Sequence, residues 1–218
     1  MKKPIIIFII KVSAIYILLM IPWPGLTEGY THLYRGVGNV IFHSLWNEGV
    51  VEFTEIPTDN LEDQDTMIIL QKRAQPGDNR PRSRGKIFSS SRYNTYVPTI
   101  LVIALILAAP LPLPRKMGAL LIGIFAVNCF ALFKLWVLIY DAFTPTEIDL
   151  IQISPLFKSI LSGTLRILNY IETGFIIPIF IWLPIFFFAL PQKDRGTWLG
   201  LIKKTFPVST AQTNSDQK

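Results

Sequence analysis

The hydrophobic positions of this chain gather in four blocks, which polar stretches separate. The blocks cover residues 5–20, 97–113, 117–140 and 175–190. Because a helix rises about 1.5 Å per residue, roughly 20 apolar residues cross the ~30 Å hydrocarbon core of a bilayer. Backbone groups in lipid must bond within their own segment, which favours helices. The pattern therefore predicts a membrane all-α bundle of four transmembrane helices with a small extracytoplasmic β-containing insert.

Six segments follow from this division. Three are expected in the membrane: residues 1–24 as transmembrane helix 1, residues 97–140 as a hairpin of transmembrane helices 2 and 3, and residues 175–191 as transmembrane helix 4. Three are polar: residues 25–96 as an extracytoplasmic α+β insert, residues 141–174 as an extracytoplasmic loop with an amphipathic helix, and residues 192–218 as a cytoplasmic basic tail. A cleaved signal peptide is the alternative for the first block. Its apolar run exceeds the roughly 7–15 residues of such peptides, and no small-x-small site follows.

Shorter patterns predict the elements of the polar segments. Apolar residues at helical spacing predict an amphipathic helix that Thr27 caps and that continues to Leu45. Three strands are expected after it, at residues 51–56, at residues 66–70, and a third to which residues 86–88 and 93–97 both contribute. Ser154 is expected to cap a second amphipathic helix, with Pro155 in its first turn.

Composition and charge favour a membrane protein. Of the 218 residues, 50% are hydrophobic and 17% are charged, against roughly 25% charged residues in soluble domains. The formal net charge of +6 does not indicate nucleic acid, because the Lys and Arg residues lie beside the apolar blocks. Basic segments face the cytoplasm, and the N-terminus, the Pro114-Arg115-Lys116 turn and the tail are basic. Both termini are therefore expected in the cytoplasm.

Motifs that carry chemistry are scarce in this sequence. It contains no phosphate-binding glycine loop, no HExxH and no GxSxG. The single cysteine, Cys129, falls within the third apolar block, whereas His32 and His43 lie in the insert. Because a thiolate nucleophile needs a base within reach, we expect no catalytic residue, no cofactor and no metal.

The region around the second and third blocks resembles a known family. Residues 92–98 (RYNTYVP), the apolar block that follows, the basic turn and the next apolar block are similar to the exosortase-associated small membrane proteins of Gram-negative bacteria. More distantly, Arg115 and Asn128 resemble the Arg-then-Asn spacing of exosortases, which are similar to cysteine transpeptidases with Cys, Arg and His on the outer membrane face. This chain departs from that enzyme pattern in the position of Cys129 and in lacking a late His. The resemblance implies an accessory protein of envelope protein sorting.

Together, these patterns predict a non-enzymatic accessory protein of the bacterial inner (cytoplasmic) membrane, multi-pass, whose insert docks a partner. The expected partners are the lipid bilayer and a membrane or extracytoplasmic protein, and not nucleic acid. A membrane cysteine transpeptidase or protease using Cys129, or a small transporter subunit, is the alternative. The residues expected at interaction or packing positions are Phe53, Arg92, Tyr96, Arg115, Asn128 and Lys134.

Overall fold

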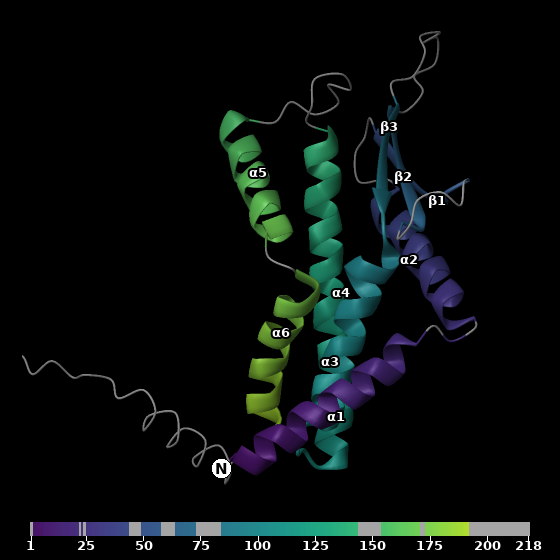
Figure 1. Cartoon of the computed structure of the whole chain (residues 1–218). Helices are drawn as coiled ribbons and strands as arrows, with labels where there is room; N and C mark the ends of the chain where they lie inside the picture. Colours follow the sequence, from purple (N-terminus) through teal and green to yellow (C-terminus); the bar gives the residue numbers. More distant parts are fainter. Residues whose placement is uncertain are drawn as a thin grey trace, which may run out of the picture.

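The structure, a computed structural model, describes residues 2–21, 23, 25–43, 49–57, 64–72, 84–143, 154–170 and 173–191. Within these ranges the chain forms six α-helices, a π-helical turn and a three-stranded antiparallel sheet (Figure 1). The helices are α1 (Lys2–Met20), α2 (Leu26–Phe42), α3 (Val97–Ala108), α4 (Leu113–Phe143), α5 (Pro155–Tyr170) and α6 (Thr173–Ala189). The strands are β1 (Gly49–Glu55), β2 (Thr66–Lys72) and β3 (Arg84–Ser89), and the π-helical turn η1 (Arg92–Tyr96) joins β3 to α3.

The fold class predicted from the four apolar blocks is wrong. Among the described residues, one helix is long and apolar enough to cross a membrane, over Leu113–Ala142 of α4. The other apolar helices are shorter: Ile5–Met20, Arg92–Ala108 and Gly174–Ala189. Four transmembrane helices are therefore not shown. The described chain is instead a set of six helices with a three-stranded sheet.

The turn between α3 and α4 explains part of this difference. Ala109 has extended backbone angles, φ −63° and ψ 141°, which a residue before proline prefers. Pro110 and Pro112 follow it, and neither has an N–H with which to continue α3. The turn therefore lies at residues 109–112, and Arg115, which we expected within the turn, belongs to α4. The helix α3 is shortened to 12 residues, while α4 reaches 31 residues.

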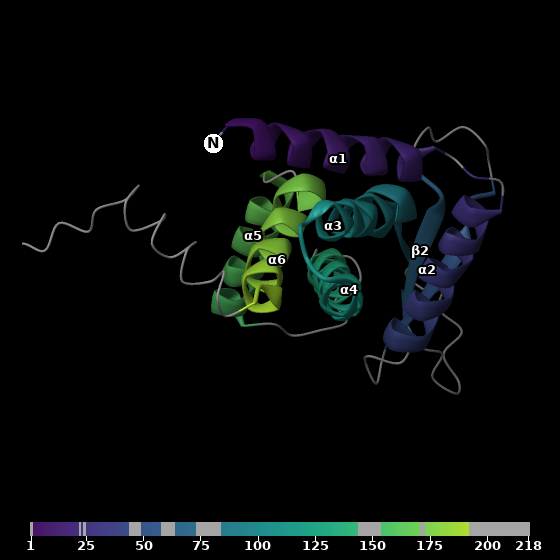
Figure 2. The same cartoon turned by 90° about the horizontal axis from the view of Figure 1, so that it is seen from below.

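An apolar bundle of α1, α3, α6 and the N-terminal half of α4 forms the lower end of the molecule (Figure 1, Figure 2). Its core joins side chains of α3 and α4 to Leu190, which directly follows α6. The helix α1 packs along α3, and the rings of Phe8 and Trp182 stack with centroids 5.7 Å apart. Gly123 allows α4 to approach α3 closely, because a Cβ there would lie 2.7 Å from Ile106 Cδ1.

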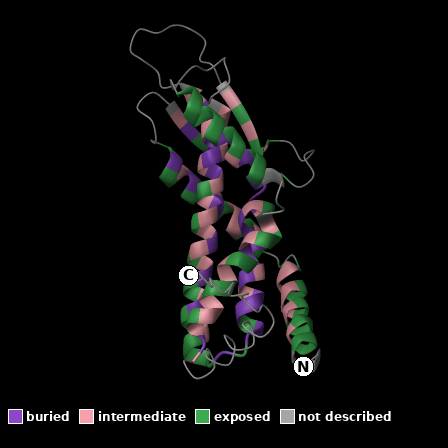
Figure 3. Cartoon of the chain, turned by 90° about the vertical axis from the view of Figure 1, so that its left-hand side faces the viewer, coloured by how far each residue is buried: buried purple, intermediate pink, exposed green. Residues whose placement is uncertain are grey.

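The outside of this bundle is apolar too. On α1 the exposed side chains include Ile5, Ile6, Ile7, Ile9, Ile10, Ile17 and Leu18. Figure 3 shows this helix, beside the N label, exposed along most of its length. On α4 and α6, Leu121, Phe125, Phe180 and Phe188 are each more than 60% exposed. Many exposed apolar side chains on neighbouring helices are characteristic of contact with a membrane or another protein.

The sheet, α2 and the C-terminal half of α4 form a head at the other end of the molecule (Figure 1). The strands make an antiparallel meander in the order β1-β2-β3, in which Phe53 pairs with Ile68 and Ile68 with Ile87. One core collects the inward side chains: Tyr34, Phe42, Val51, Phe53, Ile68, Leu70, Leu135 and Ile139. Because the last two belong to α4, this helix passes without a break from the bundle core into the head core.

Most of the predicted elements of the head are confirmed. Residues 51–56 and 66–70 are expected strands, and β1 and β2 occupy nearly the same positions. For the third strand, residues 86–88 lie within β3, whereas residues 93–97 are helical. This helical segment begins at Ser91, whose N–H donates a hydrogen bond to the Asp65 carboxylate.

The two amphipathic helices are confirmed, with one difference in capping. In α5 the Phe157 N–H donates to Ser154 Oγ at 3.3 Å, as predicted for the N-cap. The helix packs on α4 through three buried residues, Leu161, Leu165 and Leu168. In α2 the N-cap is Gly25, with φ +78°, and Thr27 lies inside the helix. Leu45, the predicted end of α2, lies outside the described residues.

Candidate functional site

A polar network joins the head to the bundle. The Tyr34 hydroxyl and Ser89 Oγ are 2.9 Å apart, and Asn94 Nδ2 donates to Ser89 Oγ at 3.1 Å. Lys134 Nζ then donates to Asn94 Oδ1 at 3.1 Å. Burial raises the pKa of the Tyr34 phenol, so this hydroxyl stays neutral and keeps its proton. The network therefore connects α2, β3, η1 and α4.

Asp65, directly before β2, forms a second link at this junction. Its carboxylate accepts hydrogen bonds from the Ser91 N–H at 3.0 and 3.1 Å, and from Ser91 Oγ at 2.6 Å. Thr66 Oγ1 donates to it at 2.7 Å, and Thr31 Oγ1 lies 3.0 Å from Ser91 Oγ. A carboxylate at a helix N-terminus also interacts favourably with the helix dipole. The sheet, α2 and the start of the helix at Ser91 are thus held together.

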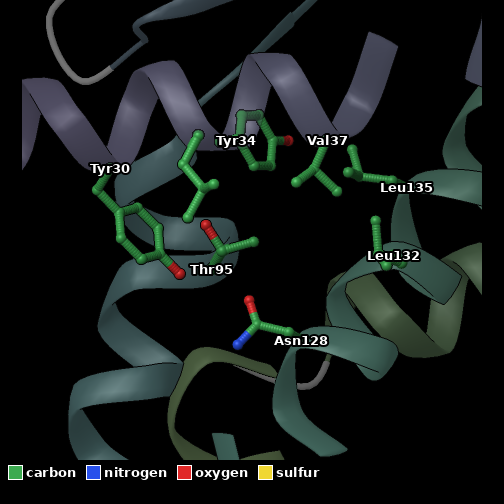
Figure 4. Close-up of a pocket in the computed structure, with 8 residues that line it drawn as sticks. Tyr30, Tyr34, Val37, Thr95, Asn128, Leu132 and Leu135 are labelled. Carbon is green, nitrogen blue, oxygen red and sulfur yellow. The ribbon is translucent and has the colours of Figure 1, made fainter. Parts of the chain in front are cut away.

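A cavity of about 240 Å³ lies beside this network (Figure 4). It is lined by Tyr30, Leu33, Tyr34, Val37, Thr95, Asn128, Leu132 and Leu135. Figure 4 shows α2 along one side of the cavity and Asn128 reaching toward it from α4 on the other side. Mostly apolar walls with a few convergent polar groups are typical of sites that bind small ligands.

Three of the residues that we singled out from the sequence lie around this junction. Asn128 Nδ2 donates to the Ile124 carbonyl of its own helix at 2.8 Å, and lies 3.5 Å from Thr99 Oγ1 on α3. Tyr96 donates its hydroxyl to the Leu19 carbonyl at 2.7 Å, which fastens α1 to η1. Lys134 takes part in the polar network described above. The structure therefore brings Tyr96, Asn128 and Lys134 into one region.

The other three residues have separate environments. Arg92, the first residue of η1, is half-buried. Phe53 is 3% exposed and belongs to the head core, where its ring lies 6.1 Å from that of Tyr34. Arg115 lies near the N-terminal end of α4, where its Nη1 donates to the Ala189 carbonyl at 3.4 Å. Phe53 thus packs inside the head, and Arg115 lies far from the junction.

Several junction residues were missed by sequence reasoning. Tyr34 and Ser89 are 55 residues apart, and Asp65 and Ser91 are 26 apart, so no local pattern pairs them. One signal was present, because three consecutive serines, residues 89–91, stand between a strand and an apolar helix. Serine is favoured at helix starts, so this run marks a helix start that sequence reasoning overlooked.

The outward face of the sheet is a second surface of interest. The register places Glu52, Ile69 and Lys86 in one row, and Thr54, Met67 and Phe88 in the next. The Phe88 side chain is 43% exposed, and both charged residues are exposed. This face therefore presents an apolar centre between an anion and a cation.

The free edge of β1 is covered by a side chain of α2. Asn39 Nδ2 donates to the Phe53 carbonyl at 3.0 Å, and the Phe53 N–H donates to Asn39 Oδ1 at 2.7 Å. The amide thereby replaces the hydrogen bonds that another strand would make at this position. An exposed edge invites strand addition, and this contact blocks it in the middle of β1.

No catalytic or metal-binding group emerges among the described residues. Within them, no set of three or more His, Cys, Asp and Glu residues lies close enough to hold a metal ion. Cys129 is exposed on α4, and both His32 and His43 are exposed on or beside α2. When compared with known proteins, the chain matches no family model, no curated sequence and no solved structure.

Proposed function

We propose that this protein is a non-enzymatic accessory protein of the bacterial inner membrane. In this proposal α4 crosses the bilayer, and the head docks a protein partner on the outer side. The observation that carries it is the path of α4, which contributes to the bundle core through Ala119 and Val127 and to the head core through Leu135 and Ile139. One continuous helix therefore connects the folded head to the apolar bundle.

The length of α4 supports this placement. At about 1.5 Å per residue, its 31 residues extend for roughly 47 Å. A hydrocarbon core of about 30 Å takes up roughly 20 residues, counted from Met117, which follows the basic Arg115 and Lys116, to about Trp136. Lys134 then lies at the outer edge of the core, where a lysine side chain can extend toward polar groups, here Asn94 Oδ1. The rest of α4 lies beside the sheet and α5.

The charge distribution supports the orientation. Arg115 and Lys116 lie at the end of α4 remote from the head. Basic residues that flank a membrane helix favour the cytoplasmic side. The head would then face the outside of the inner membrane. The resemblance of residues 92–98 and 114–116 to exosortase-associated membrane proteins supports placing the partner in envelope protein sorting.

The outward face of the sheet is the docking surface in this proposal. Met67, Ile69 and Phe88 form its apolar centre, and Glu52 and Lys86 flank it. Apolar anchors in the middle of a polar rim are the common arrangement of protein interfaces. The matching partner surface would have an apolar centre flanked by one cation and one anion.

Photo-crosslinking in cells tests this assignment. We expect a photoreactive amino acid in place of Phe88 to capture a protein partner, since this side chain is exposed on the docking face. The matched control replaces Val40, an 83% exposed apolar residue of α2, and should give much less of that adduct. Equal capture at Phe88 and Val40, or no adduct at Phe88 in a membrane fraction containing the protein, would contradict the docking surface.

A further inference from the structure

We propose that a groove between α4 and α6, at the end of the bundle away from the head, binds an anionic phospholipid. The groove measures about 750 Å³. Its lining comes from α4 and α6 and includes Arg115, Gly118, Ile122, Ile185 and Phe188. This inference rests on the membrane placement proposed above and goes beyond it, because it assigns a ligand class to a second surface.

Arg115 supplies the recognition of the phosphate. Its side chain is exposed and makes one long hydrogen bond, from Nη1 to the Ala189 carbonyl at 3.4 Å. A guanidinium carries five N–H donors in a planar fork that matches phosphate oxygens. The neighbouring Lys116 is already engaged, since its Nζ donates to the Leu107 carbonyl at 2.9 Å. Arg115 is therefore the cation positioned for a ligand.

No carboxylate of the described helices neutralises this end of the molecule. The helices α1, α3 and α6 contain no Asp or Glu, and the one acidic residue of α4 is Asp141, near its opposite end. The positive charge of Arg115 can therefore be neutralised by an anion from outside the described chain. Basic pockets between membrane helices on the cytoplasmic side bind anionic lipid head groups.

The groove also provides room for an acyl chain. Ile122, Ile185 and Phe188 line it with apolar atoms. The space around Gly118 is open, because a Cβ placed on this residue would have no atom within 4 Å. A ligand that places a phosphate at Arg115 and a hydrocarbon chain along the apolar walls is a phospholipid. Free phosphate would occupy only the position at Arg115.

Native mass spectrometry of the purified full chain, released from nanodiscs of mixed phosphatidylglycerol and phosphatidylcholine, tests the assignment. We expect wild-type protein to retain phosphatidylglycerol preferentially. Arg115→Gln should lower its retention about tenfold, because charge-assisted hydrogen bonds to the phosphate are lost. Gly118→Leu should lower retention similarly by filling the groove, and the open space around its Cβ favours normal folding.

Two variants on α5 serve as matched controls. Arg166→Gln removes an exposed cation, and Gly163→Leu adds a side chain where a Cβ also meets no atom within 4 Å. Both should retain lipid as the wild type does. If Arg115→Gln and Gly118→Leu retain as much phosphatidylglycerol as the wild type, the lipid site is wrong, while the membrane placement is unaffected. A wild-type protein that purifies as a dimer, with both variants monomeric, would assign the groove to a second copy instead. Wild-type protein that fails to sediment with membranes would overturn the membrane placement itself.

Discussion

At the scale of single residues, Gly38 determines how closely α2 approaches the sheet. A Cβ on this residue would lie 2.8 Å from two carbons of the Phe53 ring, so the ring would have to move within the head core. We expect Gly38→Ala to reduce the free energy of unfolding by about 1–3 kcal/mol, the usual cost of overpacking. Denaturant titration of the detergent-solubilised protein, followed by tryptophan fluorescence, measures it.

Gly36, on the same helix, is the matched control. It is exposed, and a Cβ there would have no atom within 4 Å. Because alanine is the better helix former, Gly36→Ala should raise stability by roughly 0.5–1 kcal/mol. If both variants lose the same stability, the close contact between Gly38 and Phe53 is not the cause.

Tyr34 gives the head a specific response to alkaline pH. Burial raises the pKa of its phenol above the ordinary value of 10.0, so the folded state holds the proton more tightly than the unfolded chain. The resulting stabilisation is complete below about pH 10 and declines as pH rises above that value. At neutral pH, Tyr34→Phe should cost about 1 kcal/mol through the lost Ser89 hydrogen bond.

Unfolding titrations between pH 7 and pH 11 check this expectation. We expect the gap between wild type and Tyr34→Phe to shrink above pH 10, because only the wild type loses the Tyr34 proton. A gap that stays constant over the whole range would show that this phenol does not titrate differently in the folded protein.

The sequence predicted which residues share one face of a strand, but not which residues elsewhere in the chain pack against that face. Alternation placed Val51 and Phe53 on one side of a strand, and the structure confirms that both are buried. It could not show that Leu135 of α4 packs in the same core. The long separation along the chain also hides the hydrogen bond between Tyr34 and Ser89.

At the scale of elements, Asp65 connects the sheet to the helix that enters the bundle. Its carboxylate accepts hydrogen bonds from the backbone and hydroxyl of Ser91 and from Thr66. We expect Asp65→Ala to lower the free energy of unfolding by about 2–3 kcal/mol, since hydrogen bonds to charged groups are lost. Hydrogen exchange should show faster opening at residues 89–96 in the same variant.

Gln64→Ala is the control for this element. Gln64 precedes Asp65 and is exposed, so its replacement should change stability by no more than about 0.5 kcal/mol. An Asp65→Ala protein as stable as the control, with unchanged exchange at residues 89–96, would refute the capping role.

Helix ends proved harder to predict than helix faces. The periodicity of α5 and its cap at Ser154 were both visible in the sequence and are confirmed. The N-cap of α2 is Gly25, which has a left-handed backbone conformation. The sequence pointed instead to Thr27, because threonine is a common N-cap residue. The helix that begins at Ser91 is capped by the carboxylate of Asp65, 26 residues away, and no local pattern indicates this contact.

At the scale of the whole molecule, the four apolar blocks do not correspond to four helices long enough to cross a membrane in the described part of the chain. The prolines after Ala109 shorten α3 and place residues 113–116 in α4. Residues 97–113 and 117–140, expected as helices of about 17 and 24 residues, therefore give helices of 12 and 31 residues. Block boundaries alone could not reveal this difference, since apolar residues continue on both sides of the turn.

The central claim is that α4 crosses the bilayer with the head outside. Two exposed positions report on its two sides: Glu52 in the head and Pro114 at the start of α4. Each receives a single cysteine in a Cys129→Ser background, and sealed spheroplasts are treated with a membrane-impermeant thiol reagent. We expect labelling of Glu52→Cys at once, and labelling of Pro114→Cys after the membrane is disrupted. Labelling of Pro114→Cys in sealed spheroplasts, with or without labelling of Glu52→Cys, would contradict the claim.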